Sequence, residues 1–162
     1  MLKLVGSLFI IIAGAMAGNS AAVSFRNKLE LQRTLLKMYS ETAIMLKYSF
    51  ITLPELIEQL RRNNEYSSLS FLDVDDDTDI RRSLLDKLRA WDMADEESMS
   101  ILKSFFINFG TTDISGQLSY AAMARARQSE IVERETKQLN KRSRFARTFG
   151  VLGGAFAAVM MI

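Results

Sequence analysis

Histidine and cysteine are both absent from this sequence of 162 residues, and Pro54 is its only proline. Without histidine, the chain has no Ser-His triad, no His-bearing zinc site and no imidazole acid or base. Without cysteine, it has no disulfide framework, thiolate nucleophile or iron–sulfur cluster. Only enzymes that rely on carboxylate, lysine, serine or tyrosine side chains remain, and we expect neither a metal nor a cofactor.

Charge is missing from both ends of the chain. No charged residue occurs in the 22 residues of Leu4–Phe25 or in the 15 residues of Thr148–Ile162. Apart from Lys3, every charge lies within Arg26–Arg147, which holds 20 of the 21 Lys and Arg and all 19 Asp and Glu. The net charge of +2 does not favour a nucleic-acid partner. The sequence therefore predicts a charged domain at 26–147 between apolar segments at 1–25 and 148–162.

The first apolar segment has the length of a membrane span. As a helix, Leu4–Phe25 measures about 33 Å, enough for a hydrocarbon core of about 30 Å. A cleaved signal peptide is the alternative, with Ala15, Met16 and Ala17 forming an A-x-A site. Arg26 and Lys28 follow closely, and such cations disfavour export. We expect an uncleaved transmembrane helix.

The second apolar segment is shorter, about 22 Å as a helix. A buried core helix is the alternative, but Thr148–Ile162 has no polar face. The cations that precede it can extend to a membrane interface. They are Lys141, Arg142, Arg144 and Arg147. We expect a second transmembrane helix, and the positive-inside rule then places 26–147 in the cytoplasm.

Each apolar segment contains two glycines four residues apart. These pairs are Gly14 with Gly18 and Gly150 with Gly154. Small residues at this spacing allow two helix backbones to approach closely in lipid. Glycine is also common in membrane helices without such contacts, so the pairs are a hypothesis for helix packing.

The charged middle shows helical periodicity and no strand-like alternation. Apolar residues recur every three or four positions through its first part: Leu29, Leu35, Leu36, Tyr39, Ala43, Leu46 and Phe50. We predict that the first membrane helix continues to Phe50 without a break. Pro54 ends it and begins a second helix over 55–62, since proline is tolerated in a first turn. Residues 61–70 are predicted to be a polar loop.

Three more helices are predicted, over 78–91, over 96–109 and from Ile114 to the chain end. Gly110 has the place of a C-terminal glycine cap, and Asp113 that of an N-cap. The sequence thus predicts an all-α protein, a cytoplasmic helical bundle entered and left by transmembrane helices.

Three charged stretches are candidates for chemistry. Asp73–Asp79 has the aspartate spacing that opens an EF-hand, but Thr78 and Leu84 stand where that loop needs glycine and glutamate. Asp95–Glu97 lies at a helix start, where acidic side chains complement the helix dipole. The run 125–147 carries eight Lys and Arg against three Glu, which suits lipid headgroups. The chain has no P-loop motif.

Several motifs together carry a resemblance to a known family. They are Met1–Gly6, Tyr48 to Glu55 with Pro54, Gly110 to Asp113 with Gln117, and Lys141 with Gly150–Gly154. With the predicted topology, they make the chain similar to the stage III sporulation protein AB family of endospore-forming bacteria. Two departures stand out: Ser49 replaces a usual glycine, and Ile51–Thr52 stands where Thr-Pro is typical.

The resemblance implies a non-enzymatic protein in the mother-cell membrane around the forespore, within the transenvelope complex that links the two cells. The family's cytoplasmic domain is similar to that of the type II secretion inner-membrane platform protein. The implied partners are stage III sporulation protein AA, which looks like a secretion ATPase, and other membrane proteins of the complex, together with lipid. A homo-oligomer is compatible with these features. A membrane-anchored lipid-binding tether and a carboxylate-only membrane enzyme are the alternatives.

Overall fold

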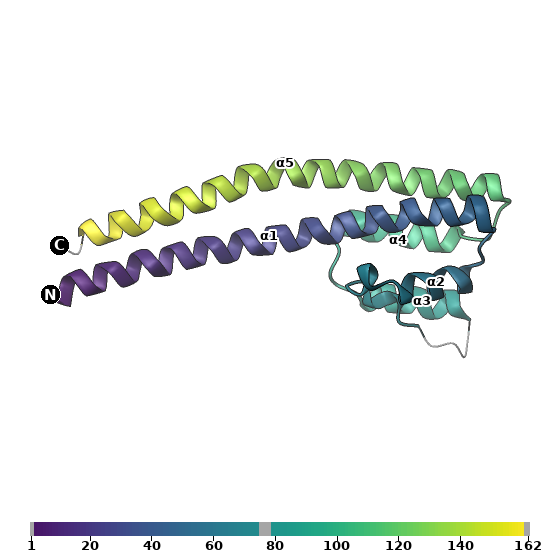
Figure 1. The fold of residues 1–162 in the computed structure, drawn as a ribbon, viewed down its shortest axis with the longest axis horizontal. Coiled ribbons are helices and arrows are strands. Elements are labelled where there is room, and N and C mark those ends of the chain that lie inside the picture. The colour runs from purple at the N-terminus through teal and green to yellow at the C-terminus, as the bar shows by residue number, and fades with distance from the viewer. Residues whose placement is uncertain (1, 75–78, 161–162) are drawn as a thin grey trace. The chain divides into compact units, whose positions relative to one another are not determined.

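The computed structural model describes the backbone of residues 2–74 and 79–160, and the side chains of residues 20, 23–74, 79–141 and 148. In these ranges the chain forms α-helices, short 3-10 helices and loops, with no strand (Figure 1). The predicted all-α class is therefore confirmed. The α-helices are α1 (Leu2–Ser49), α2 (Leu53–Arg62), α3 (Ile80–Ala90), α4 (Glu96–Asn108) and α5 (Ile114–Met160), and the 3-10 helices are η1 (Asn64–Tyr66) and η2 (Ser70–Leu72).

Three helices begin at aspartates whose side chains accept hydrogen bonds from backbone N–H groups of the first turn. Asp79 accepts from Arg82, Asp95 from Ser98 at 2.8 Å, and Asp113 from Gly116 at 3.0 Å. These bonds satisfy amides that have no partner within the helix. The prediction that Asp113 caps the last helix is confirmed.

The structure divides into two compact units, which are described separately. Glu30–Glu133 is a helical bundle with a buried core. The second unit contains α1 up to Leu29 and α5 from Arg134. Among the residues with described side chains, no helix offers a stretch long and apolar enough for a membrane crossing. The predicted membrane segments, 1–25 and 148–162, lie almost entirely outside those residues.

Aromatic side chains form the centre of the bundle core. Tyr39 of α1 meets Phe105 of α4 edge-on, with ring centroids 5.1 Å apart. Phe71 of η2 packs against Trp91 at 4.8 Å and against Phe106 at 6.0 Å. Full burial of a large apolar side chain contributes about 1.5–3 kcal/mol. These contacts therefore hold α1, α4 and η2 together.

The segment predicted as a polar loop, 61–70, is part of this core, so the polar prediction was wrong. Tyr66 and Leu69 are almost completely buried, and so is Leu72 just beyond. The three residues are three positions apart, which is the period of a 3-10 helix. The polar residues between them hid this short period in the sequence.

Candidate interaction site at one end of the bundle

Several helix ends meet at one end of the Glu30–Glu133 unit (Figure 1). Three residues separate the end of α1 from the start of α2, and five separate the end of α4 from the start of α5. Most family-motif residues named above lie here: Tyr48 and Pro54 at the first connection, and Gly110, Asp113 and Gln117 at the second. We call the first connection the α1–α2 turn and the second the α4–α5 turn.

The side chain of Gln117 holds the α4–α5 turn through hydrogen bonds to the backbone. Gly110 has φ +73°, a left-handed conformation that costs glycine nothing. Its N–H donates to Oε1 of Gln117 at 3.0 Å, while Nε2 of Gln117 donates to the carbonyl of Thr112 at 3.1 Å. Gln117 therefore ties both sides of the turn, which gives this motif residue a structural role.

Arg81, at the start of α3, closes the end of α4. Its two guanidinium nitrogens, Nη1 and Nη2, donate to the carbonyl oxygens of Ile107 and Phe109, each at 2.6 Å. Carbonyls in the last turn of a helix have no partner within the helix, and a cation also complements the dipole there. Sequence reasoning missed Arg81 because 26 and 28 residues separate it from its acceptors.

The α1–α2 turn contains a left-handed residue that is not glycine. Phe50 has φ +49° and is 67% exposed. The expectation that Phe50 extends the apolar face of the first helix was wrong, because α1 ends at Ser49 and the turn directs the ring outward. Ile44 and Tyr48 are also exposed, at 58% and 72%. The Nζ atom of Lys47 lies 5.4 Å from the centre of the Tyr48 ring.

The start of α2 is capped by Glu55 and Thr52. The Glu55 carboxylate accepts hydrogen bonds from the backbone N–H of Thr52 at 2.8 Å and from its hydroxyl at 2.7 Å. The backbone N–H bond lowers the pKa of Glu55 below its usual value. Pro54 lies in the first turn of α2, as predicted.

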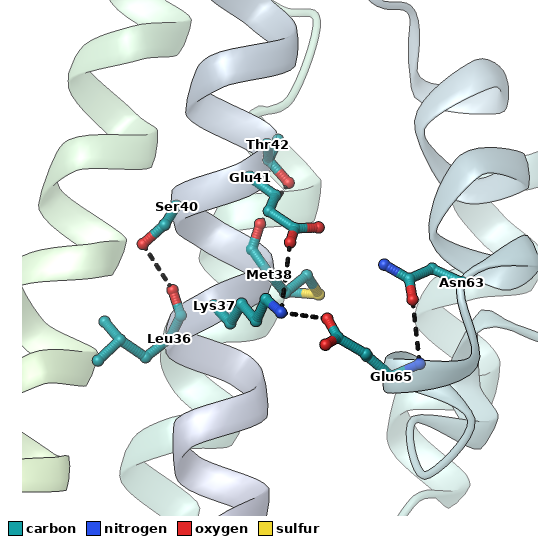
Figure 2. A network of polar contacts seen from close by, with 8 residues as sticks. All are labelled: Leu36, Lys37, Met38, Ser40, Glu41, Thr42, Asn63 and Glu65. Carbon is teal, nitrogen blue, oxygen red and sulfur yellow. Dashed lines mark hydrogen bonds and ion pairs between the residues drawn. The ribbon is translucent and has the colours of Figure 1, made fainter.

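A surface network joins α1 to η1 (Figure 2). Lys37 forms an ion pair with Glu65 of η1, and its Nζ lies 3.8 Å from Oε1 of Glu41 on its own helix. The hydrogen bond to Glu65 raises the pKa of Lys37. Asn63 accepts from the backbone N–H of Glu65 at 3.0 Å. Burial, and then the Glu41 carboxylate, raise the pKa of Tyr66. Exposed ion pairs contribute little to stability, so this network mainly orients η1.

A buried polar cluster joins α1, α4 and α5 farther along the bundle. Gln32 is its centre: Nε2 donates to Asp95 Oδ2 at 2.5 Å, and Oε1 accepts from Ser98 Oγ at 2.7 Å and from Gln128 Nε2 at 2.6 Å. The side chains of Gln32, Ser98 and Gln128 are at most 4% exposed. A slip of one helix by a turn would break these buried bonds, so the cluster fixes the register of the three helices.

Sequence reasoning also missed this cluster, although a signal was present. Gln32 lies three residues after Leu29 and three before Leu35, on the apolar side of its helix. Gln128 stands likewise between the buried Ala124 and Ile131. A polar residue in an apolar stripe predicts a hydrogen-bonded partner in the core.

The remaining predicted site residues all belong to the second unit. Arg26, Lys28 and Lys141 are exposed and belong to the second unit. The others lie outside the residues with described side chains: Gly14, Gly18, Gly150, Gly154, Arg142, Arg144 and Arg147. Residues 75–78 of the acidic stretch lie outside the described residues as well. Among the residues that are described, no cluster of three or more Asp or Glu is arranged to bind a metal ion.

A family model described as stage III sporulation protein AB matches residues 3–162, nearly the whole chain. No curated protein and no solved structure matches. The match covers both connections at the bundle end as well as the apolar termini.

Proposed function

We propose, from the premise that this chain belongs to the stage III sporulation protein AB family, that it acts as a non-enzymatic membrane platform. Membership makes it a sporulation-related protein. In the proposal, the protein resides in the mother-cell membrane around the forespore, within the complex that links the two cells. Its bundle docks a cytoplasmic secretion-type ATPase, stage III sporulation protein AA.

The observation that carries this proposal is the continuity of the two long helices. α1 runs from Leu2 to Ser49 and α5 from Ile114 to Met160, each without a break. Both helices therefore contribute to the bundle core and also continue into the apolar terminal segments. A displacement of the bundle is transmitted along a helix more directly than through a flexible linker.

The buried cluster around Gln32 supports the same role. It joins α1 and α5 to each other and to α4 by hydrogen bonds within the core. A bundle with a fixed register moves as one body, which a platform requires. A passive tether needs no such polar layer.

The exposed cations support the proposed topology. Arg26 and Lys28 follow the first apolar segment, and Lys141 precedes the second. All three side chains are free to face lipid headgroups at a cytoplasmic surface. In the proposal both termini lie across the membrane.

Topology is tested with single cysteines, since the native chain has none. We expect a cysteine at Gln59, which is exposed on α2, to resist a membrane-impermeant thiol reagent in intact cells and to react after permeabilisation. When the chain is produced in vegetative cells, where the far face of the membrane is open to the medium, a cysteine inserted after Met1 should react without permeabilisation. Labelling of residue 59 in intact cells would refute the cytoplasmic placement.

Docking is tested by purifying the detergent-solubilised full-length chain from sporulating cells. We expect stage III sporulation protein AA to copurify in near-stoichiometric amounts. An unrelated protein with two membrane spans and the same tag is the control. If lipid alone accompanies the chain, the platform proposal is wrong and the tether is the better description.

A further inference from the structure

We propose that Ile44, Tyr48 and Phe50 form the surface on which the ATPase binds. This inference rests on the proposed function and adds to it the residues that make the contact. We call these three side chains the apolar patch. They belong to the last turns of α1 and to the α1–α2 turn, at the bundle end shown in Figure 1.

The apolar patch faces away from the core. Ile44 and Tyr48 are four residues apart and share one side of α1. Leu46, two residues from each, is 1% exposed, and two residues correspond to about 200° around a helix. The patch side of α1 therefore lies opposite the side that packs into the bundle. More than half of the surface of each patch residue stays exposed to solvent.

Phe50 adds an independent observation. A bulky residue with φ near +50° is a backbone outlier, and glycine would adopt this conformation without strain. The ring is two-thirds exposed, so core packing does not account for the strain. Strained residues that the fold does not need are concentrated at binding sites. The strain is thus kept at an exposed aromatic residue two positions after Tyr48.

The size of the apolar patch indicates what occupies it. Given the area of these side chains and their exposed fractions, the patch covers about 400 Å². A stable dimer of two copies needs about 800 Å² on each partner, so self-association through this patch alone is not favoured. Two aromatic rings with an aliphatic neighbour match the energetic centre of a larger contact with a different protein.

Charge indicates the chemistry of that protein. Lys47 is exposed beside the Tyr48 ring and places one positive charge next to the patch. The complementary surface is an apolar pocket bordered by carboxylates. A lipid partner is disfavoured by the position of the patch along α1. Tyr48 lies 18 residues after Glu30, about 27 Å along the helix. The predicted membrane boundary at Arg26 comes before Glu30 in the sequence.

The test measures binding of purified stage III sporulation protein AA to the full-length chain in lipid nanodiscs. We expect Phe50→Gly to weaken binding at least tenfold without lowering the melting temperature, because glycine removes the strain. Ile44→Lys, on an exposed helix face, should weaken binding equally while its melting temperature stays native. Met93→Ser is the matched control, since Met93 is 60% exposed outside the patch and should leave binding unchanged.

The outcomes separate this inference from the proposed function. If the unmodified chain does not bind the ATPase, the proposed function fails. If it binds and both patch variants bind as tightly, the patch inference alone is overturned. A photoreactive benzoylphenylalanine at position 48 should cross-link to the ATPase in cells; cross-linking only to a second copy or to lipid would overturn the inference.

Discussion

Two turns at one end of the Glu30–Glu133 unit each contain a residue in the left-handed backbone conformation, but the residue differs. The α4–α5 turn places a glycine in the left-handed region, at φ +73°, and the α1–α2 turn places a phenylalanine there, at φ +49°. The glycine turn is surrounded by bonds from Arg81, Gln117 and Asp113. The phenylalanine turn is followed by the Thr52–Glu55 cap and directs its ring outward.

The difference shows which turn serves the fold. At Gly110 the side chains of Arg81, Gln117 and Asp113 hold the surrounding backbone, and glycine stores no strain there. At Phe50 the chain keeps a strained residue whose side chain contacts little of the core. We therefore assign a mainly structural role to the α4–α5 turn and a contact role to the α1–α2 turn.

The largest effect is expected at Arg81. In Arg81→Ala, the carbonyls of Ile107 and Phe109 lose their charged donor, and we expect a loss of about 2 kcal/mol in the free energy of unfolding. Chemical denaturation of the detergent-solubilised full chain measures it. Arg81→Lys should recover only part of the loss, since one ammonium does not reproduce the two-pronged geometry. Full recovery by lysine would mean that charge alone matters.

The next prediction distinguishes the two turns by the sign of the change in unfolding free energy. Gly110→Ala forces a β-carbon into the left-handed region, so we expect a loss of about 1–2 kcal/mol in unfolding free energy. Steric contact is not the cause, because the nearest atom to that β-carbon would be Nη2 of Arg81 at 3.8 Å. The matched variant Phe50→Gly should change stability in the opposite direction. Equal signs in the same denaturation series would contradict the assignment.

A smaller effect is expected at Asp113. Asp113→Ala removes the oxygen that accepts from Gly116 N–H, at a cost of about 1 kcal/mol in unfolding free energy. Asp113→Asn keeps an acceptor and should unfold close to wild type. If both variants unfold like wild type but lose binding to the ATPase, Asp113 belongs to the contact surface instead.

The smallest effect concerns Glu55, whose folded-state pKa is lowered by the Thr52 N–H. A lowered pKa means that this carboxylate stabilises the fold above its unfolded pKa, about 4.3, and that the contribution disappears as pH falls through the folded value. We expect Glu55→Gln to melt slightly below wild type at neutral pH. The two melting temperatures should converge in acid. A difference independent of pH would show that the charge is not responsible.

The sequence alone determined most of the helices and several of their caps, because those depend on neighbours within a few residues. Asp95 and Asp113 accept from amides three positions ahead, Pro54 starts α2, and Gly110 follows the end of α4. The periodic apolar residues likewise predicted the all-α class. These signals are local, so the amino-acid order is sufficient to show them.

Only the tertiary structure decided which distant residues meet. The bonds of Gln32 join residues 63, 66 and 96 positions apart, and no local pattern names the partner across such separations. Tertiary packing also buried Tyr66 and Leu69 within a polar segment, where core contacts outweigh local preference. Tertiary packing also exposed Phe50, which the apolar periodicity had assigned to the core side of the helix. The place where α1 ends, and the direction of the turn that follows, depend on where α2 packs.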